Sequence, residues 1–222
     1  MVAAHRPLLL PVHLHSNTGS TVLHAAIEMA LADMDAQSLQ SGQGQRVCGV
    51  LFAEQDVAQL ALHLGQVAVQ TLPDSGLPPS SGQRRLLRFF DPLVMPPLWD
   101  LSSDAQRRAL LGPISIWMSL GFDRNWQTLR SPAPGATDGQ ALPASRIWNT
   151  QQWQQLLALG AFNPVALEMG LKASTLEHRP RVLNTLCRLM GLGIHAPNDL
   201  KAMAQLALTQ HPDFDQHPAV QR

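Results

Sequence analysis

The stretch RRLLRFFDPLVMPPLWDL, residues 84–101, gathers arginine, phenylalanine and proline in a chain that is otherwise weakly charged. Its first seven residues alternate in the manner of a strand, with Leu87 and Phe89 on one face. Asp91 and Pro92 then predict a helix start, because aspartate caps helix N-termini and proline suits the first turn. The Pro-Pro pair that follows is expected to keep this helix short. The stretch therefore predicts a strand that passes directly into a helix.

The segments before and after this stretch alternate between the periods of strands and helices. Ser20 is the predicted N-cap of the first helix, and Ser103 with Gln106 forms a capping-box pattern at the start of another. Strands are predicted over residues 8–14, 47–53, 67–72, 114–120 and 125–129, and helices over residues 21–34, 54–66 and 104–111. This order predicts an α/β lobe with a mixed or antiparallel sheet and flanking helices.

A linker is predicted over residues 131–146, which are rich in proline, glycine, alanine and serine and lack periodicity. Beyond it, helices are predicted over residues 149–160, 164–174, 180–193 and 197–210, the first capped by Asn149 and ended by Gly160. The expected fold class is α+β. It comprises an α/β lobe over residues 1–130 and a small all-α lobe over residues 147–222.

The composition bounds the class of partner. Sixteen basic residues balance sixteen acidic ones, and only 14% of the chain is charged, so no overall field attracts nucleic acid or an anionic membrane surface. Hydrophobic residues make up 45% of the chain, which favours apolar surface and hence a protein partner. No stretch reaches the roughly 18 apolar residues of a membrane span, and no cleavable leader is apparent. A cytoplasmic protein is expected.

The sequence VHLHSNTGS suggests one enzymatic alternative. His13 and His15 stand at the end of a predicted strand, as in several metal-dependent hydrolases. The segment resembles the DLHSHT opening of polymerase-and-histidinol-phosphatase phosphoesterases, but His13 replaces its aspartate and Asn17 its second histidine. A metal-dependent phosphoesterase is therefore kept as an alternative, although no metal or other cofactor is expected.

Other catalytic patterns have no strong candidate. Cys48 and Cys187 are far apart and have no metal-ligand spacing, so reduced thiols are expected. The pairs Asp33/Asp35 and Asp213/Asp215 are typical of solvated helix ends. We expect no catalytic residue.

Three arginines suggest a second alternative. Arg84, Arg85 and Arg88 alternate with aromatic residues, as in strands that bind nucleic acid by base stacking. The neutral net charge weakens this interpretation. Arg88 is expected instead to pair with a carboxylate or to hold a neighbouring loop.

The order of these motifs resembles the domain shared by type VI secretion adaptor proteins, the effector chaperones encoded beside the spike protein VgrG. The resemblance covers roughly residues 47–215. It is carried by Gly49, Val50, Leu51, Leu60, His63, Leu64, Leu87, Arg88, Phe89, Phe90, Asp91, Pro92, Val94, Leu98, Leu101, Gln106, Gly112, Pro113, Ile114 and Trp117, and near the end by Gly193, Ile194, Asp199, Leu200, Leu206 and Phe214. Leu93, Phe90 and Gly65 depart from the usual residues, and the first 46 residues lack the family's acidic start.

The resemblance implies a non-enzymatic cytoplasmic adaptor that binds a toxin effector and helps to load it onto the VgrG spike. Its partners would be the effector and possibly VgrG itself. Large apolar residues in MPPLW and around WQQ are the predicted partner contacts: Leu93, Met95, Trp99, Trp148 and Trp153. The alternative is that the tryptophans are core residues. The signature residues Arg88, Phe90, Asp91, Pro92, Gly112, Pro113 and Trp117 are expected to be structural.

Overall fold

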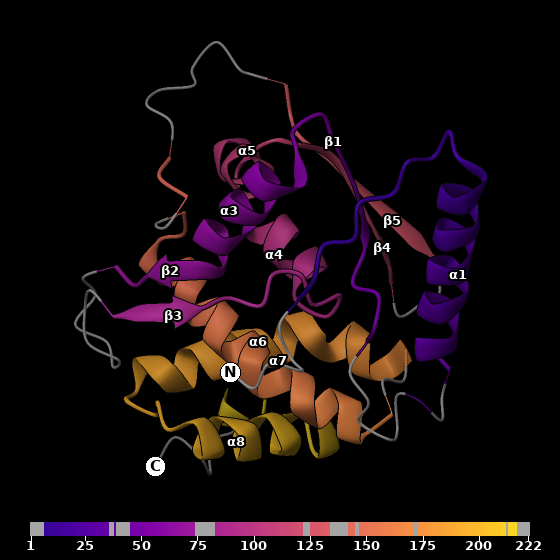
Figure 1. Cartoon of the computed structure of the whole chain (residues 1–222). Helices are drawn as coiled ribbons and strands as arrows, with labels where there is room; N and C mark the ends of the chain where they lie inside the picture. The colour runs from indigo at the N-terminus through magenta and orange to yellow at the C-terminus, as the bar shows by residue number, and fades with distance from the viewer. Residues whose placement is uncertain are drawn as a thin grey trace. The chain divides into compact units, whose positions relative to one another are not determined.

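The structure is a computed structural model that describes residues 7–35, 38, 45–73, 83–121, 125–133, 142–144, 147–170, 173–211 and 213–216. The chain divides into two compact units (Figure 1). The first comprises Met1–Ser38, Gln43–Thr71 and Gln83–Ile147, and the second comprises Leu39–Gly42, Leu72–Gly82 and Trp148–Arg222. Helices and strands occur together in the first unit, and the α+β class is confirmed.

The first unit contains most of the regular elements. In chain order these are α1 (Asn17–Asp33), β1 (Val50–Ala53), α3 (Val57–Ala68), β2 (Val69–Thr71), β3 (Arg84–Leu86), α4 (Met95–Leu101), α5 (Asp104–Leu111), β4 (Ile114–Leu120) and β5 (Trp126–Arg130). The second unit contains α6 (Thr150–Glu168), α7 (Ala173–Gly191), α8 (Pro197–Thr209) and the 3-10 turn η2 (Phe214–Gln216).

Two antiparallel sheets organise the first unit. The larger has the strand order β1-β4-β5, so β4 is central and pairs with both neighbours. Trp117 on β4 lies opposite Leu51 on β1 and Leu129 on β5. The smaller sheet pairs β2 with β3, and Gln70 lies opposite Arg85. All described strand pairings are antiparallel, which is one of the two arrangements predicted, a mixed or an antiparallel sheet.

The predicted strand over residues 8–14 is wrong. Residues 7–13 belong to no strand, and Leu8 is 91% exposed. Pro7 and Pro11 have no N–H to give to a sheet, which weakens pairing here. The helix that follows also begins earlier than predicted: α1 starts at Asn17, and its N-cap is Ser16, whose Oγ accepts a hydrogen bond from Gly19 N–H at 3.0 Å.

The C-terminal end of α1 is tied to the larger sheet. Ala30 and Met34 form a buried cluster with Leu120 of β4. Asp33 Oδ1 accepts a hydrogen bond from Arg46 Nε at 2.8 Å, and Asp33 Oδ2 accepts one from the Arg46 backbone N–H at 2.7 Å. This pairing fixes the chain just before it enters β1.

The stretch that decides the fold differs from its prediction in two ways. The strand stops at Leu86, and the helix begins at Met95 instead of Pro92. Between them Asp91 holds a turn: its Oδ1 accepts from Leu93 N–H at 2.9 Å, and its carbonyl accepts from Val94 N–H at 2.8 Å. The two prolines begin α4 rather than limiting it, because the first turn of a helix needs no N–H partner.

Elements with complete local signals agree with the prediction. Ser103 and Gln106 make both hydrogen bonds of the capping box at the start of α5. β4 and β5 form the predicted hairpin. These two predictions are confirmed.

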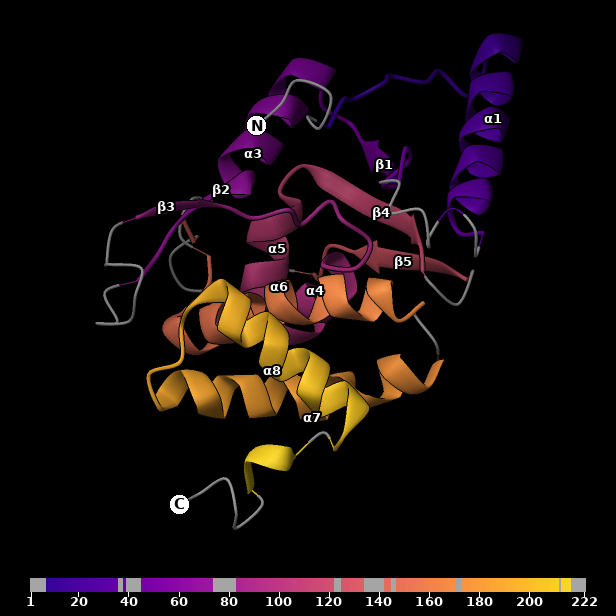
Figure 2. The ribbon, with the colours of Figure 1, turned by 90° about the horizontal axis from the view of Figure 1, so that it is seen from below.

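The second unit packs α6, α7 and α8 against one another (Figure 2). Its buried residues include Phe162, Val182, Leu186 and Ala204. Asn149 caps α6 as predicted. The predicted break at Gly160 is wrong, because α6 continues through Pro164 to Glu168. The two helices predicted over residues 149–160 and 164–174 are thus largely one helix. Burial of its face around Phe162 stabilises the helix beyond the local cost of glycine and proline.

An arginine holds the C-terminal turn of the second unit. Arg188 Nε and Nη2 donate to the two carboxylate oxygens of Asp215 at 2.7 and 2.8 Å. Nη2 also donates to Thr185 Oγ1 at 2.8 Å and lies 3.3 Å from Asp213 Oδ1. The hydrogen bond from Arg188 lowers the pKa of Asp215. Asp213 and Asp215 are therefore partners of one guanidinium.

We expect acid to detach this turn. Because the folded pKa of Asp215 is depressed, its stabilising contribution is complete above the ordinary aspartate pKa of about 3.9 and is lost as the pH falls through the folded value. Amide exchange of Phe214–Gln216 should accelerate between about pH 5 and about pH 2, after correction for intrinsic exchange. Asp215→Asn should show fast exchange throughout this range. A wild-type profile without acceleration would contradict the prediction.

Candidate functional site

Two of the signature residues, Phe90 and Trp117, contact Phe89, which is 1% exposed. Its ring makes edge contacts with Phe90, with centroids 5.8 Å apart, and with Trp117 of β4 at 5.7 Å. The strand-turn-helix stretch is thereby fastened to the central strand of the larger sheet. Such aromatic pairs stabilise a core beyond their buried area.

Gly49, just before β1, permits the chain to approach Trp117 of β4 closely. A Cβ at this position would lie 2.7 Å from Trp117 Nε1 and 2.8 Å from the Met118 carbonyl oxygen. Both distances are shorter than non-bonded atoms tolerate. A residue without a side chain is therefore required where the chain enters β1 beside Trp117.

Arg88 and Asp91 form an ion pair over the turn. Arg88 Nη2 lies 3.1 Å from Asp91 Oδ2, and the Arg88 side chain is 65% exposed. An ion pair this exposed contributes little stability. The more important contact is the hydrogen bond that Asp91 accepts from Leu93 N–H. Pro92 is buried, and Pro113 is half-buried beside the start of β4.

His63 and Gly112 fix the end of α5 against α3. His63 Nε2 lies 3.0 Å from the Leu110 carbonyl oxygen. Gly112 ends α5 with a φ of +53°, and a Cβ there would overlap the His63 ring. Glycine is therefore required at residue 112 both by its backbone conformation and by the imidazole beside it.

Two buried glutamines hold the chain where the first unit ends: Gln106, predicted only as a capping residue, and Gln70, for which no role was predicted. Gln70 is 0% exposed, and its Nε2 donates to the carbonyls of Val67 at 2.7 Å and Ala144 at 2.5 Å. Its Oε1 accepts from Ile147 N–H at 3.1 Å, and Gln106 Nε2 donates to the Ile147 carbonyl at 2.8 Å. Ala144 and Ile147 are thus bound through their backbones. A glutamine inside a predicted strand gives no local signal of this role.

The predicted partner-contact residues fall into two groups. Leu93, Met95, Trp148 and Trp153 are buried and offer no surface to a partner in this conformation. The burial of Trp148 and Trp153 agrees with the alternative that the tryptophans are core residues, and the predicted partner contacts stay predictions. Trp99 is only half-buried and remains a candidate.

Trp99 is positioned by Arg107. The Arg107 guanidinium carbon lies 5.1 Å from the centroid of the indole ring, and Arg107 Nε donates to the Trp99 carbonyl at 3.0 Å. Arg107 Nη1 also pairs with Asp104 Oδ1 at 3.1 Å. A cation–π pair next to an ion pair holds the indole in one orientation at the surface of α4 and α5.

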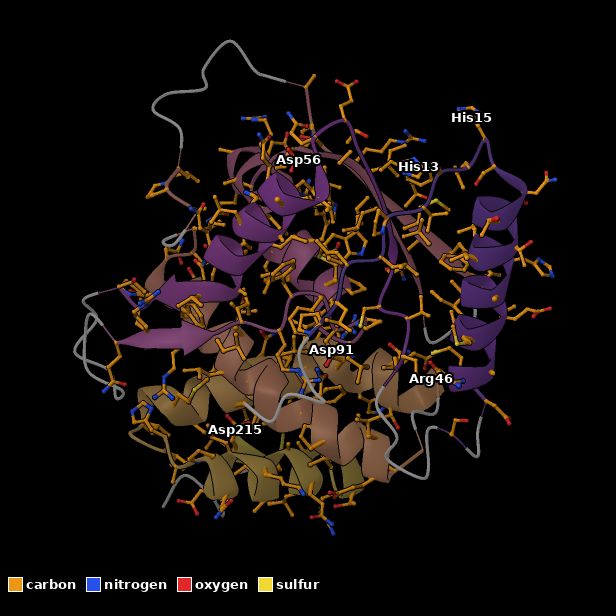
Figure 3. All side chains as sticks on the ribbon, in the orientation of Figure 1. His13, His15, Arg46, Asp56, Asp91 and Asp215 are labelled. Carbon is orange, nitrogen blue, oxygen red and sulfur yellow. The ribbon has the colours of Figure 1, made fainter. Side chains whose placement is uncertain are left out.

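The residues of the enzymatic alternative do not converge. His13 and His15 are exposed on the segment before α1 (Figure 3). Within the described ranges, no three His, Cys, Asp or Glu side chains are placed to share a metal ion. Burial raises the pKa of Cys48, and it raises the pKa of Cys187 to about 11, so both thiols are protonated at neutral pH.

The arginines of the other alternative lie on β3 and after it. Arg84 and Arg85 are exposed on β3, and Arg85 Nη2 donates to Gln83 Oε1 at 3.3 Å. Arg88 pairs with Asp91.

Among the helices that the structure describes, none combines the length and apolar composition needed to span a bilayer.

Comparison with known families gives a match over the N-terminal part of the chain. Residues 2–109 match the model of a family described as a domain of unknown function, DUF4123. The match runs from before α1 into α5 and includes Gly49, His63 and the stretch from Arg88 to Pro92. It therefore takes in residues 2–46, which the sequence resemblance left out, and stops before Gly112 and Trp117. Comparisons with curated proteins and with solved structures give no match.

Proposed function

We propose that the chain is a non-enzymatic cytoplasmic adaptor that binds a toxin effector of a type VI secretion system and assists its loading onto the VgrG spike. The DUF4123 match over residues 2–109 carries this proposal, because it includes the strand-turn-helix stretch on which the resemblance to these adaptors mainly rests. The metal-enzyme and nucleic-acid alternatives gain no comparable support.

The contacts of the residues that carry the resemblance agree with this role. Phe89 packs against Trp117, and Asp91 holds the turn before α4. Gly49 permits close approach of Trp117, and Gly112 permits close approach of His63. These are the tasks of a rigid scaffold. A scaffold of this kind can present a constant framework while its surface residues differ for each effector.

Purification of the chain from its native cell tests the proposal. A tag on the chain should retain one secreted effector in near one-to-one ratio, identified by mass spectrometry. Retention of VgrG only when the effector is present would mean that the effector bridges the two proteins. Retention of VgrG without the effector would mean that the chain contacts VgrG directly. Recovery of nucleic acid in place of an effector, or metal-dependent phosphatase activity lost on His15→Ala, would contradict the proposal.

Trp99→Ala should weaken capture of the effector. Trp99 is the one predicted contact residue that is not buried, and truncation of a central interface tryptophan costs about tenfold or more in affinity. The dissociation constant would be measured with the effector identified above. Leu192→Ala is the matched control, because Leu192 is 80% exposed in the second unit. Unchanged affinity of a folded Trp99→Ala variant would remove Trp99 from the interface.

A further inference from the structure

β3 is an exposed edge strand. It lies at the edge of the two-stranded β2–β3 sheet, and residues 83–86 are all exposed, with Leu86 at 46%. A two-stranded sheet is marginal by itself, and an edge strand with free backbone groups readily accepts a further strand. This makes the edge a candidate site for strand addition.

The register shows which backbone groups face outward. Leu87 N–H donates to the Ala68 carbonyl at 2.7 Å, so these two residues form a hydrogen-bonded pair. Hydrogen-bonded and non-hydrogen-bonded pairs alternate along an antiparallel ladder. Arg85 therefore bonds to Gln70 on β2, whereas Arg84 and Leu86 direct their N–H and C=O groups away from β2. No described residue outside β2 bonds to these groups of Arg84 and Leu86.

The charge of this edge favours one kind of partner. Arg84 and Arg85 are exposed on the strand, and Arg88 follows it with 65% of its side chain exposed. Asp91 neutralises Arg88 in part, but the two strand arginines have no described carboxylate partner. Cationic side chains on both faces of an edge strand complement an acidic strand and repel a basic one.

We propose that β3 binds an extended acidic segment of a partner protein as a third strand of the β2–β3 sheet. Acidic residues of the segment lie beside Arg84 and Arg85, and an apolar residue lies beside Leu86. Backbone hydrogen bonds to Arg84 and Leu86 give affinity, and the charges give selectivity. The proposal rests on the proposed function only for the source of the segment, which is the carried effector.

The first test uses the whole chain and a model peptide. A fluorescent peptide of about ten residues with alternating Val and Glu should bind, and its Val and Lys counterpart should not. Binding should slow amide exchange of Arg84 and Leu86 by about tenfold or more while Arg85, already bonded to β2, changes little. Equal binding of the two peptides, or slowing at Arg85 alone, would overturn the proposal.

Two variants separate backbone from charge recognition. Leu86→Pro removes an outward N–H but leaves the hydrogen bonds between Arg85 and β2, and edge strands tolerate such a proline. This variant should bind the acidic peptide about tenfold more weakly than wild type. Leu86→Ala keeps the N–H and should bind more tightly than Leu86→Pro. The double variant Arg84→Glu/Arg85→Glu should abolish binding, whereas Arg181→Glu, an exposed arginine on α7, should not.

The outcomes also separate this proposal from the adaptor role. Binding of the acidic peptide without recovery of any effector from the native cell supports strand addition and removes the effector as its source. Recovery of an effector without peptide binding at β3 overturns the strand-addition proposal and leaves the adaptor role. Tighter binding of a single-stranded oligonucleotide than of the acidic peptide, lost in Arg84→Glu/Arg85→Glu but unchanged in Leu86→Pro, would also overturn it.

Discussion

Gln70→Leu should lower the free energy of unfolding by roughly 2–6 kcal/mol, because it leaves two buried groups, the Val67 carbonyl and the Ile147 N–H, without a partner at about 1–3 kcal/mol each. The variant would orphan the carbonyls of Val67 and Ala144 and the N–H of Ile147. The leucine side chain fits the volume but supplies neither donor nor acceptor. Urea unfolding of the two proteins measures the difference.

Two further variants make the Gln70 prediction specific. Gln66→Leu, at an exposed position on the neighbouring α3, should change the free energy of unfolding by less than about 0.5 kcal/mol. Gln70→Glu keeps the acceptor for Ile147 but faces two carbonyls. Burial and these carbonyls should raise the pKa of the new carboxyl, so this variant should be most stable below about pH 4 and should lose stability as the pH rises. A Gln70→Leu protein as stable as wild type would contradict the prediction.

The Gln70 contacts also bear on the predicted linker. Residues 131–146 have the composition of a flexible connection, yet the backbones of Ala144 and Ile147 are bound by glutamine side chains. Composition reports local preference only. The described Ala144 is bound by a side-chain amide that is far away in the sequence.

Sequence patterns were sufficient where local and long-range preferences agree. The helix at Asp104–Leu111 has a capping box at its start and a glycine at its end, and the structure contains both the capping hydrogen bonds and the glycine stop. The hairpin of β4 and β5 likewise follows alternating apolar residues. Every local choice in these elements supports the same structure.

Prediction failed where a local rule competes with packing or with a side-chain bond. Gly160 was predicted to end one helix and Pro164 to begin the next, but burial of the helix face around Phe162 stabilises α6 as one helix through both residues. Asp91 was expected to cap a helix directly. Its carboxylate instead bonds to Leu93 N–H and adds a turn before α4. Neither outcome can be read from a window of neighbouring residues.

The sequence identified residues of the candidate site but did not distinguish the buried ones from the exposed ones. An apolar pattern identifies Met95 and Trp99 alike, although one is fully buried and the other is half-exposed. Alternation along residues 84–90 predicted a strand, but only three-dimensional pairing shows that Arg84 and Leu86 lie at a free edge. Exposure depends on elements that are distant in the chain, and a single sequence does not specify them.

Gly112→Ala should be the second strongly destabilising substitution, costing about 2–6 kcal/mol. Its φ of +53° penalises any side chain, and the new Cβ would overlap the His63 ring, which is held by a hydrogen bond to Leu110. Gly193→Ala separates these two causes: its φ is +94°, but its Cβ would meet open space, so it should cost only the backbone share, about 1–2 kcal/mol.

A double-mutant cycle isolates the contact between His63 and residue 112. Removing the imidazole with His63→Ala should relieve the overlap but leave the backbone penalty. Gly112→Ala should therefore cost about 1–3 kcal/mol less in the His63→Ala background than in wild type. Urea unfolding of the four proteins gives this coupling energy. Additive costs within about 0.5 kcal/mol would mean that the imidazole moves aside freely, and that the backbone alone requires glycine where α5 turns into β4.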